Sequence, residues 1–292
     1  MNIVFTGVCR SQTSLLLKEL KNRGWNTDCF TYNLEECEDS YGVEVFKKGV
    51  VDRMKWKIRR KIKSWDLDIR IVPNNYHLKS KSWIPWYHGK GIALPYGKKS
   101  GFISSLDLYE DYPGSIFLPR SVNFDLFSNV QRKEKTDTIV IGHLWKRKPE
   151  GLENYIFKYF KNSDMFYEAV NLLSNKGVKV NVIDDFFPRK DMPKFYSSID
   201  VFAEQFRIGS YGIPAIESLC CGIPVVGSYR SELLECKEAE EMIISAQQNP
   251  ESIAASILEA YDSKIGSTKN VREFHSSKHA ADIFEDCWKK LV

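Results

Sequence analysis

Short apolar runs alternate with longer segments of helical periodicity along the whole chain. The runs predict buried strands, and the periodic segments between them predict helices. In the first half the expected elements are a strand at 3–6, a helix from Ser11 or Thr13 to Gly24, and strands at 25–32 and 69–72. In the second half they are strands at 138–141, 178–183, 201–203 and 225–226, and helices at 166–173, 192–198, 214–222, 253–261 and 271–291. Such alternation favours parallel sheets with helices on both faces.

Length and composition indicate a globular protein of two domains. The chain has 292 residues, 43% of them hydrophobic and 27% charged. No apolar run approaches the roughly 20 residues of a membrane span, and the stretch from Met1 to Phe5 lacks the pattern of a secretory signal. The seven cysteines include no Cys-x-x-Cys spacing, so we expect reduced thiols, no zinc site and a cytoplasmic location.

The small net charge of +4 conceals one strongly basic segment. Residues 53–63 contain seven Lys or Arg side chains, and apolar residues recur there at helical spacing. A basic amphipathic helix of this kind can lie on an anionic membrane surface. It can equally pack its apolar stripe on a sheet and present its charges to water. Both interpretations stay open, and peripheral membrane contact through 53–63 is one of the expectations.

The stretch 209–228 carries the clearest chemical signal. A loop of small residues from Gly209 to Gly212 runs into Pro214, and proline is favoured in the first turn of a helix. The unpaired amides of a helix opening and the positive end of its dipole form an anion site. Glu217 follows one turn later, where a carboxylate would repel phosphate but can accept hydrogen bonds from hydroxyls. A site that binds phosphate at the helix opening and a pair of hydroxyls beside it fits a nucleoside-diphosphate sugar.

This stretch resembles the donor-binding motif of glycosyltransferase family 4, a retaining family with the GT-B fold. The family motif has two glutamates separated by seven residues. Here 211–214 (Tyr-Gly-Ile-Pro) and 221–226 (Cys-Gly-Ile-Pro-Val-Val) match its frame, and Glu217 matches the second glutamate. Gly209 stands at the position of the first, so the usual carboxylate contact to the transferred sugar is missing. Glu204, five residues upstream, could substitute for it.

The resemblance implies an α/β fold of GT-B type, with two Rossmann-like domains whose parallel sheets face a central cleft. Residues 116–127 resemble the family's inter-domain marker, and the charged stretch from Asn129 to Lys135 is the expected linker. We therefore expect an acceptor-side domain at 1–130 and a donor-binding domain at 136–270. A C-terminal helix at 271–292 is expected to cross back to the first domain.

The resemblance also implies the site residues. Arg147 and Lys148 are the expected cations for the departing diphosphate, and His88, in a His-Gly pair, is expected to face the donor sugar. A solvated basic loop and a locally bonded histidine are the plain alternatives. The residues expected to bind donor are Gly7, Arg10, His143, Asp184, Gly209, Ser210, Tyr211, Gly212, Ile213, Pro214 and Glu217.

A metal site is not expected. Asp184-Asp185 and Asp66-Leu67-Asp68 invite comparison with the metal-binding Asp-x-Asp of another glycosyltransferase fold. Asp66 and Asp68, however, precede their expected strand, and Asp184 falls where the resemblance implies that the nucleotide base is read. Cations and a helix dipole would make a divalent ion unnecessary for neutralising the diphosphate.

The expected function is retaining transfer of a hexose from a GDP- or UDP-sugar to a glycan, lipid-linked or protein-linked acceptor, with no cofactor. The residue at 209 motivates one alternative, a catalytically impaired module of GT-B fold that only binds nucleotide sugar. A doubly wound oxidoreductase is disfavoured because the first strand is followed by Gly7 alone and not by a glycine fingerprint. No nucleic-acid motif appears.

Overall fold

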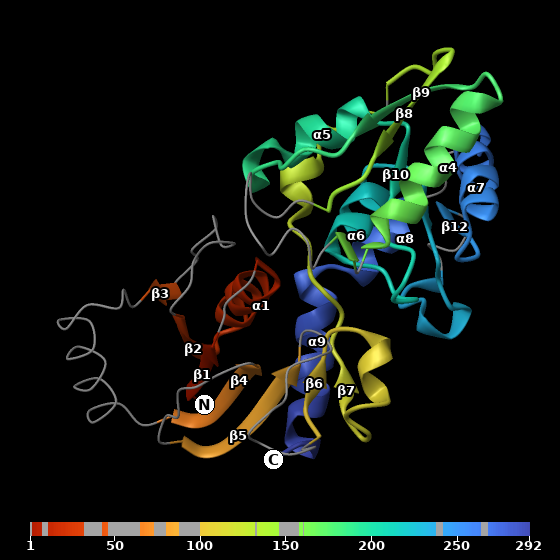
Figure 1. Cartoon of the computed structure of the whole chain (residues 1–292). Helices are drawn as coiled ribbons and strands as arrows, with labels where there is room; N and C mark the ends of the chain where they lie inside the picture. Colours follow the sequence, from red (N-terminus) through yellow and green to blue (C-terminus); the bar gives the residue numbers. More distant parts are fainter. Residues whose placement is uncertain are drawn as a thin grey trace, which may run out of the picture. The chain divides into compact units, whose positions relative to one another are not determined.

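The computed structural model divides the chain into two α/β units (Figure 1). The residues that the structure describes are 2–7, 11–31, 43–45, 65–72, 80–87, 100–131, 133–145, 158–159, 161–237, 242–263 and 268–292. The first unit comprises Met1–Asn123 and His275–Val292, and the second comprises Phe124–Phe274. The chain thus passes from one unit to the other twice, after Asn123 and after Phe274. The sequence suggested a linker at 129–135 and a C-terminal helix that returns to the first domain from 271.

The first unit is built on sheet A, whose described strands are all parallel and run in the order β3-β2-β1-β4-β5-β6-β7. The strands are β1 (Asn2–Gly7), β2 (Asn26–Thr31), β3 (Val43–Val45), β4 (Trp65–Val72), β5 (Ser80–Tyr87), β6 (Phe102–Ile103) and β7 (Ile116–Phe117). The sequence pattern predicted β1 and β2 but gave no element for 76–104, where β5 and β6 lie.

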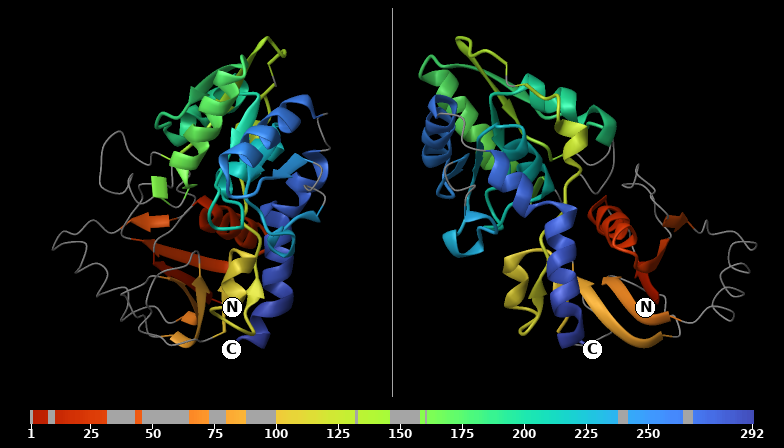
Figure 2. Two further views of the ribbon diagram at one scale, coloured as in Figure 1. Left: turned by 45° about the vertical axis from the view of Figure 1, so that its right-hand side comes forward. Right: turned by 180° about the vertical axis from the view of Figure 1, so that it is seen from behind.

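Two helices, α1 (Ser11–Asn22) and α9 (Ser277–Cys287), cover one face of sheet A and pack against each other (Figure 2). Phe284 of α9 lies in the centre of this core, with its ring 5.4 Å from that of Phe102 and 6.2 Å from that of Phe5. Strand side chains alternate between the faces, so Tyr87 and Ile103 point to the other side. There they pack on Leu108 of the 3₁₀ turn η1 (Leu106–Tyr109).

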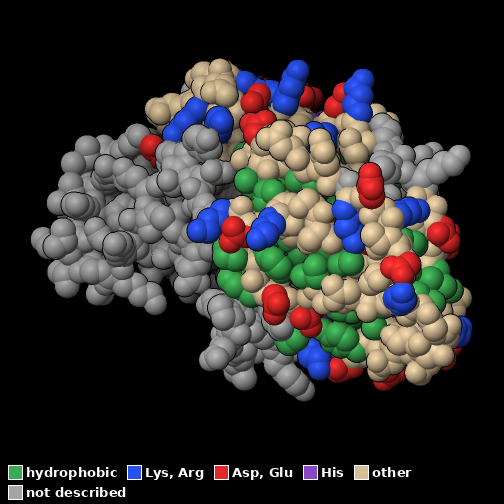
Figure 3. Space-filling view, turned by 90° about the horizontal axis from the view of Figure 1, so that it is seen from above, with side chains coloured by type: hydrophobic (Ala, Val, Ile, Leu, Met, Phe, Trp, Pro, Cys, Tyr) green, Lys and Arg blue, Asp and Glu red, His purple; other side chains and the backbone are tan. Residues whose placement is uncertain are grey.

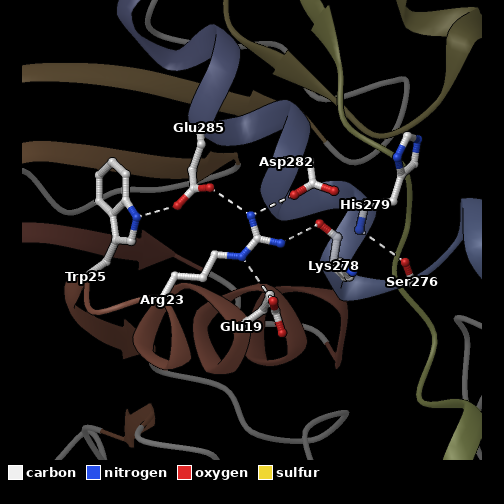
Figure 4. Close-up of polar contacts among 8 residues, drawn as sticks. All are labelled: Glu19, Arg23, Trp25, Ser276, Lys278, His279, Asp282 and Glu285. Atoms are coloured by element: carbon white, nitrogen blue, oxygen red, sulfur yellow. Dashed lines mark hydrogen bonds and ion pairs between the residues drawn. The ribbon is translucent and has the colours of Figure 1, made fainter.

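Arg23 fastens α1 to α9 (Figure 4). Its guanidinium donates to Glu19 of its own helix at 3.0 Å, and to Asp282 and Glu285 of α9 at 2.7 Å each. The indole of Trp25 donates to the second oxygen of Glu285 at 2.5 Å. The C-terminal segment is therefore joined to the N-terminal segment by ionic contacts as well as by the apolar core.

The second unit is built on sheet B, again with all described strands parallel, in the order β12-β11-β10-β8-β9. The strands are β8 (Thr138–Gly142), β9 (Lys179–Ile183), β10 (Val201–Ala203), β11 (Val225–Gly227) and β12 (Ile243–Ser245). The helices are α4 (Ser163–Asn175), α5 (Met192–Ser198), α6 (Ile213–Cys220), α7 (Pro250–Asp262) and α8 (Thr268–Phe274). The short 3₁₀ turns are η2 (Phe124–Phe127), η3 (Arg189–Asp191) and η4 (Ser231–Leu233).

Helices cover both faces of sheet B. On one face α4 and α7 pack together over a core that includes Phe166, Val201 and Ile257. On the other face α6 contacts α8, where the guanidinium of Arg272 donates to the Cys220 carbonyl at 2.6 Å. Positive and negative side chains are interspersed on the face of the molecule seen in Figure 3, with apolar side chains between them.

The C-terminal stretch corrects one expectation. In place of a single helix over 271–291, α8 ends at Phe274 and α9 begins after Ser276, whose hydroxyl caps α9 by accepting from the His279 amide at 3.1 Å. His275 lies between them, wholly buried, with Nδ1 3.0 Å from the Arg120 carbonyl. Burial lowers the pKa of His275 to about 3. The interruption coincides with the return of the chain to the first unit.

A second correction concerns the pair of aspartates near residue 67. Asp66 and Asp68 lie inside β4 and do not precede it. Asp66 accepts from the Asn2 amide at 2.9 Å, and the fully buried Asp68 pairs with Arg70 at 2.9 Å. Both carboxylates thus make contacts with residues of sheet A. Within the described part of the chain, no helix has the length and apolar character needed to cross a membrane.

Candidate functional site

The order of sheet B reverses between β8 and β10, because β9 lies on one side of β8 and β11 and β12 lie beyond β10. In open parallel sheets, ligands bind outside the carboxyl ends of the strands at such a reversal. The residues that follow the five strands at this edge are His143, Asp184, Glu204, Ser228 and Ala246. The candidate site is therefore this edge of the second unit.

Helix α6 opens toward the site from a glycine. Gly212 is its N-cap in an extended conformation, with φ −99° and ψ 178°, and Pro214 lies in the first turn. Pro214 has no N–H, and the Ala215 and Ile216 amides donate to the Gly212 carbonyl at 3.1 and 3.2 Å, so the Ile213 amide is the one in this turn that is left for another partner. The positive end of the helix dipole adds to the attraction of this amide for an anion. The anion site that the sequence predicts at this opening stays a prediction.

The loop before α6 is fixed by hydrogen bonds from three sides. The Arg230 amide donates to the Gly209 carbonyl at 3.0 Å, the Gln205 amide group donates to the Ser210 carbonyl, and the Cys236 amide donates to the Tyr211 hydroxyl at 3.1 Å. Ser210 and Tyr211 are buried, while Gly212, Ile213 and Pro214 are half-buried. Of the predicted loop residues, it is therefore 212–214 that a ligand can reach most readily.

A buried ion pair lies directly beneath the helix opening. The Lys161 ammonium contacts Glu204 Oε1, and this oxygen is 3.0 Å from the point where a Cβ on Gly212 would stand. The Glu204 side chain is 1% exposed and that of Lys161 is 12% exposed. Glu204 Oε2 has no hydrogen-bond partner among the residues that the structure describes. The charged atom next to the start of α6 is therefore a carboxylate oxygen of Glu204, and the Lys161 ammonium is bound to that oxygen.

Sequence reasoning missed Lys161, although a signal for it exists. The family resemblance calls for a lysine followed by glycine, and the prediction chose Lys148, which precedes Pro149. Asn162 adopts the left-handed conformation with φ 52°, which asparagine tolerates better than most side chains. Lys161-Asn162, immediately before α4, thus reproduces the backbone of a Lys-Gly pair. The signal was an asparagine in the place of a glycine at a helix start.

Glu217 is buried within α6 and both of its oxygens contact protein groups. The Arg189 guanidinium donates to Oε1, and the Tyr196 hydroxyl lies 3.0 Å from Oε2 and 2.9 Å from the Pro214 carbonyl. Burial raises the pKa of Glu217, and the charge of Arg189 opposes that rise. Arg189 also stacks over the Phe127 ring, 5.4 Å from its centroid. Ribose hydroxyls would have to take over the contact that Arg189 now makes.

His143 has a structural position. It is fully buried, with Nδ1 2.8 Å from the Ala203 carbonyl and Nε2 2.8 Å from the Ser163 hydroxyl, and its ring lies 4.3 Å from that of Phe166. Burial lowers the pKa of His143 to about 4, so the ring is neutral. Both ring nitrogens are used to join β8, β10 and α4, and the predicted contact of His143 with the donor receives no support from this geometry.

Asp184 lies at the carboxyl end of β9, half-buried. It accepts from the Tyr167 hydroxyl and, at 3.3 Å, from the indole of Trp145. Two hydrogen-bond donors on neighbouring aromatic rings thus hold this carboxylate at the edge where the nucleotide base is predicted to bind. No group of three or more His, Cys, Asp or Glu side chains suited to a metal ion occurs in the described ranges.

The remaining predicted residues lie elsewhere. Gly7 ends β1 opposite Ile71 of β4, at the point where the strand order of sheet A reverses. Arg10, His88, Arg147 and Lys148 lie outside the described residues, as does the basic segment 53–63. Their predicted roles stay predictions.

The second unit coincides with a known sequence family. Residues 124–275 match the family described as glycosyl transferases group 1, which is more than half of the chain. The chain belongs to this family. Family membership makes it a transferase enzyme that acts in glycosyl transfer. No curated protein sequence matches the chain significantly.

Solved structures with little sequence similarity share the fold. A glycosyltransferase from Rickettsia africae ESF-5 aligns with a TM-score of 0.62 at 12% identity, over 99% of this chain and 98% of that chain. Sucrose-phosphate synthase from Thermosynechococcus elongatus gives 0.63 at 12% identity, over 100% and 99%. HepE from Anabaena, in complex with UDP-glucose, gives 0.55 at 12% identity and 100% coverage of both chains. The fold is GT-B.

Proposed function

We propose that the chain transfers a hexosyl group from a GDP- or UDP-sugar to a glycan, lipid-linked or protein-linked acceptor, with retention of anomeric configuration. The observation that carries the proposal is the opening of α6 at Gly212, on the edge of sheet B where the strand order reverses, with the Lys161 ammonium bound to Glu204 beside it. Two phosphates carry charge that such a group of donors can neutralise. The complex of the fold relative HepE with UDP-glucose supports a nucleotide sugar as the donor.

In the proposed complex, the diphosphate lies at Gly212 to Pro214 and the ribose lies against Glu217. The ribose hydroxyls would displace Arg189 from the Glu217 carboxylate, and Arg189 would then be near the nucleotide. Asp184, held by Tyr167 and Trp145, would be near the base. These roles follow from the positions of the residues at the carboxyl edge of sheet B.

The proposed reaction forms a bond between the acceptor oxygen and the anomeric carbon while the bond from that carbon to the phosphate oxygen breaks. The acceptor attacks on the face from which the diphosphate leaves, and the departing phosphate oxygen takes the acceptor proton. Lys161 and the α6 amides stabilise the charge that develops on the diphosphate. We propose that no metal ion is required, and that the protein acts in the cytoplasm, with peripheral membrane contact through 53–63.

A panel of GDP-, UDP- and ADP-sugars tests this function. Calorimetry measures binding, nucleotide release with acceptor glycans measures transfer, and NMR of the product reports the anomeric configuration. We expect tight binding of one nucleotide class, release that survives a chelator, and retention. Binding without any release would favour the binding module, inversion would exclude retention, and loss of activity with a chelator would show a metal requirement. Failure of every nucleotide to bind would contradict the proposal as a whole.

Glu217→Gln tests the ribose contact. The neutral amide accepts hydroxyl donors less strongly than a carboxylate, so the affinity for nucleotide should fall by about 1–3 kcal/mol. Glu259→Gln, on the exposed face of α7, is the control and should bind nucleotide like the wild type. Unchanged affinity in Glu217→Gln would remove Glu217 from the donor site.

A further inference from the structure

A cavity of about 410 Å³ adjoins the loop before α6, at the carboxyl ends of β11 and β12. Its walls include Arg207, Gly209, Ser228, Arg230 and Gln247, and all of its lining belongs to the second unit. The volume lies in the range of about 300–1,000 Å³ that is typical of small-molecule sites. It therefore suits a group of the size of a sugar ring better than a single small ion.

The lining of this cavity is basic. It contains two arginines, and none of the described residues that line it is acidic. Arg207 donates from Nε to the Tyr159 carbonyl at 3.1 Å and from Nη2 to Asn162 at 3.4 Å, which fixes the direction of its guanidinium. The nearby carboxylate of Glu232, 65% exposed, is 3.7 Å from Arg230 Nε. Arg230 is 46% exposed, and a surface pair of this kind contributes little to stability.

Arg230 occupies the space above Gly209. A Cβ at residue 209 would be 3.2 Å from both Cγ and Nε of Arg230, and the φ of +82° at Gly209 disfavours any side chain there. The Arg230 amide also donates to the Gly209 carbonyl, so the backbone holds the two residues together. This point of the site consequently presents a guanidinium group, where a carboxylate at 209 would have presented the opposite charge.

A buried hydroxyl adds a hydrogen-bonding group. Ser228 is 8% exposed, and its Oγ has no partner in the part of the chain that the structure describes. A buried polar group without a partner is costly, so a ligand that supplies one is favoured. Guanidinium groups bind carboxylates with two parallel hydrogen bonds, a geometry that a hydroxyl of a neutral sugar cannot provide.

We propose that this cavity binds the carboxylate of an acidic glycosyl group, so that the donor is a nucleoside-diphosphate uronate and not a neutral hexose donor. The inference rests on the proposed function, because it places the transferred sugar next to the diphosphate site at α6. It specifies the transferred hexosyl group as a uronic acid, a hexose whose terminal carbon is oxidised to a carboxylate.

Calorimetry with matched donors tests the proposal. UDP-glucuronate is compared with UDP-glucose, and the corresponding GDP-linked pair is measured in parallel. The wild type should bind the acidic member of the preferred pair about 10- to 100-fold more tightly, the range expected for charge-assisted hydrogen bonds. Arg230→Gln should abolish this preference and change the affinity for the neutral donor by less than about 3-fold.

Further variants separate charge from folding. Arg230→Lys keeps the positive charge but cannot form the two parallel hydrogen bonds of a guanidinium, so it should retain only part of the preference for the acidic donor. Arg207→Gln should reduce it as well, whereas Lys176→Gln, an exposed cation at the end of α4, should leave it unchanged. Thermal melts of all four variants report whether they fold.

Four results would overturn the inference. Equal affinity of the wild type for acidic and neutral donors would show that the cavity does not select a carboxylate, and the proposed function would stand. An equal loss for both donors in Arg230→Gln would assign Arg230 to the diphosphate. Tighter binding of a uronate-terminated acceptor, with none for the acidic donor, would move the carboxylate to the acceptor. If no nucleotide binds at all, the proposed function fails and this inference fails with it.

Discussion

At the scale of single residues, Lys161 and Glu204 stabilise each other as an ion pair. A lone carboxylate that is 1% exposed would be strongly destabilising, and the ammonium of Lys161 compensates for it. The ion pair in turn fixes an ammonium group that would otherwise sample many rotamers in water. The ammonium is thus held on Glu204, whose Oε1 lies 3.0 Å from the Cβ position of Gly212, before any substrate arrives, and such preorganisation makes charge stabilisation effective in catalysis.

Removing Lys161 should therefore reduce turnover far more than donor affinity. Lys161→Met is expected to lower kcat by about 100- to 1,000-fold, the usual effect of losing one group that stabilises developing charge. The measurement is steady-state turnover at saturating donor. The variant leaves Glu204 buried without its partner, at a cost of about 3–5 kcal/mol of stability, so it is combined with Glu204→Gln to restore folding.

Lys158 provides the matched control, because its ammonium pairs at 2.5 Å with Asp164, whose side chain is 77% exposed. Lys158→Met should keep the turnover of the wild type. A folded Lys161→Met, Glu204→Gln double variant with undiminished turnover would show that Lys161 only serves stability.

His143 predicts a pH dependence of stability. The unfolded chain binds a proton at this residue below its ordinary pKa of 6.5, whereas the folded chain keeps it neutral down to about 4. The free energy of unfolding should consequently decrease as the pH falls from 6.5 to 4, by up to about 1.4 kcal/mol per pH unit. Urea unfolding at several pH values, in the wild type and in His143→Gln, isolates this contribution. Identical slopes in the two proteins would contradict it.

At the scale of elements, sequence periodicity predicted the bounds of a helix or strand correctly where a single apolar pattern covers the whole element. It gave 192–198 for α5 and 201–203 for β10, because each has a clear apolar pattern between polar boundaries. It failed at His275-Ser276, where a buried histidine and a capping serine interrupt an otherwise continuous helical pattern. It also failed for Lys161, because the left-handed backbone of Asn162 is a property of the fold and leaves only a weak trace in sequence.

In the donor motif too, local features were predicted from the sequence and contacts between distant segments were not. The sequence predicted the helix opening at Ile213-Pro214 and an acid, Glu217, one turn further in, since both follow from residue types at fixed spacing. It did not predict that Glu217 is buried. It did not predict that Arg189 from η3 contacts Glu217, or that Arg230 lies over Gly209, because both contacts join segments about 20 residues or more apart. Such contacts depend on how strands are ordered in sheet B.

The turn before α6 leads to a prediction about Gly209. Gly209→Ala places a Cβ at a φ of +82°, which costs about 1–2 kcal/mol, and also within 3.2 Å of the Arg230 side chain. Gly177 after α4 has nearly the same φ of +83° but nothing within 4 Å of its Cβ position. Gly177→Ala therefore measures the backbone strain alone. Denaturant unfolding should show a larger loss for Gly209→Ala; equal losses would mean that Arg230 moves aside without cost.

At the scale of the whole molecule, the two ends of the chain make one unit while the middle makes the other. Residues 275–292 complete the core of the first unit through Ala280, Ala281 and Phe284. The first unit therefore cannot be complete until the chain has been synthesised through α9. The second unit, 124–274, is continuous in sequence and coincides with the family match at 124–275.

The contact between α1 and α9 makes this dependence measurable. Arg23→Met removes the ionic contacts to Asp282 and Glu285, and should lower the unfolding free energy of the first unit by about 1–2 kcal/mol, since Asp282 is half exposed and partly screened. Hydrogen exchange of 277–287 should accelerate accordingly, whereas nucleotide affinity, assigned to the second unit, should not change. Lys21→Met, an exposed cation in the last turn of α1, is the control and should leave exchange in α9 as it is. Exchange in α9 that is equally fast in the wild type and in Arg23→Met would show that Phe284 and the apolar core alone hold the C-terminal segment in place.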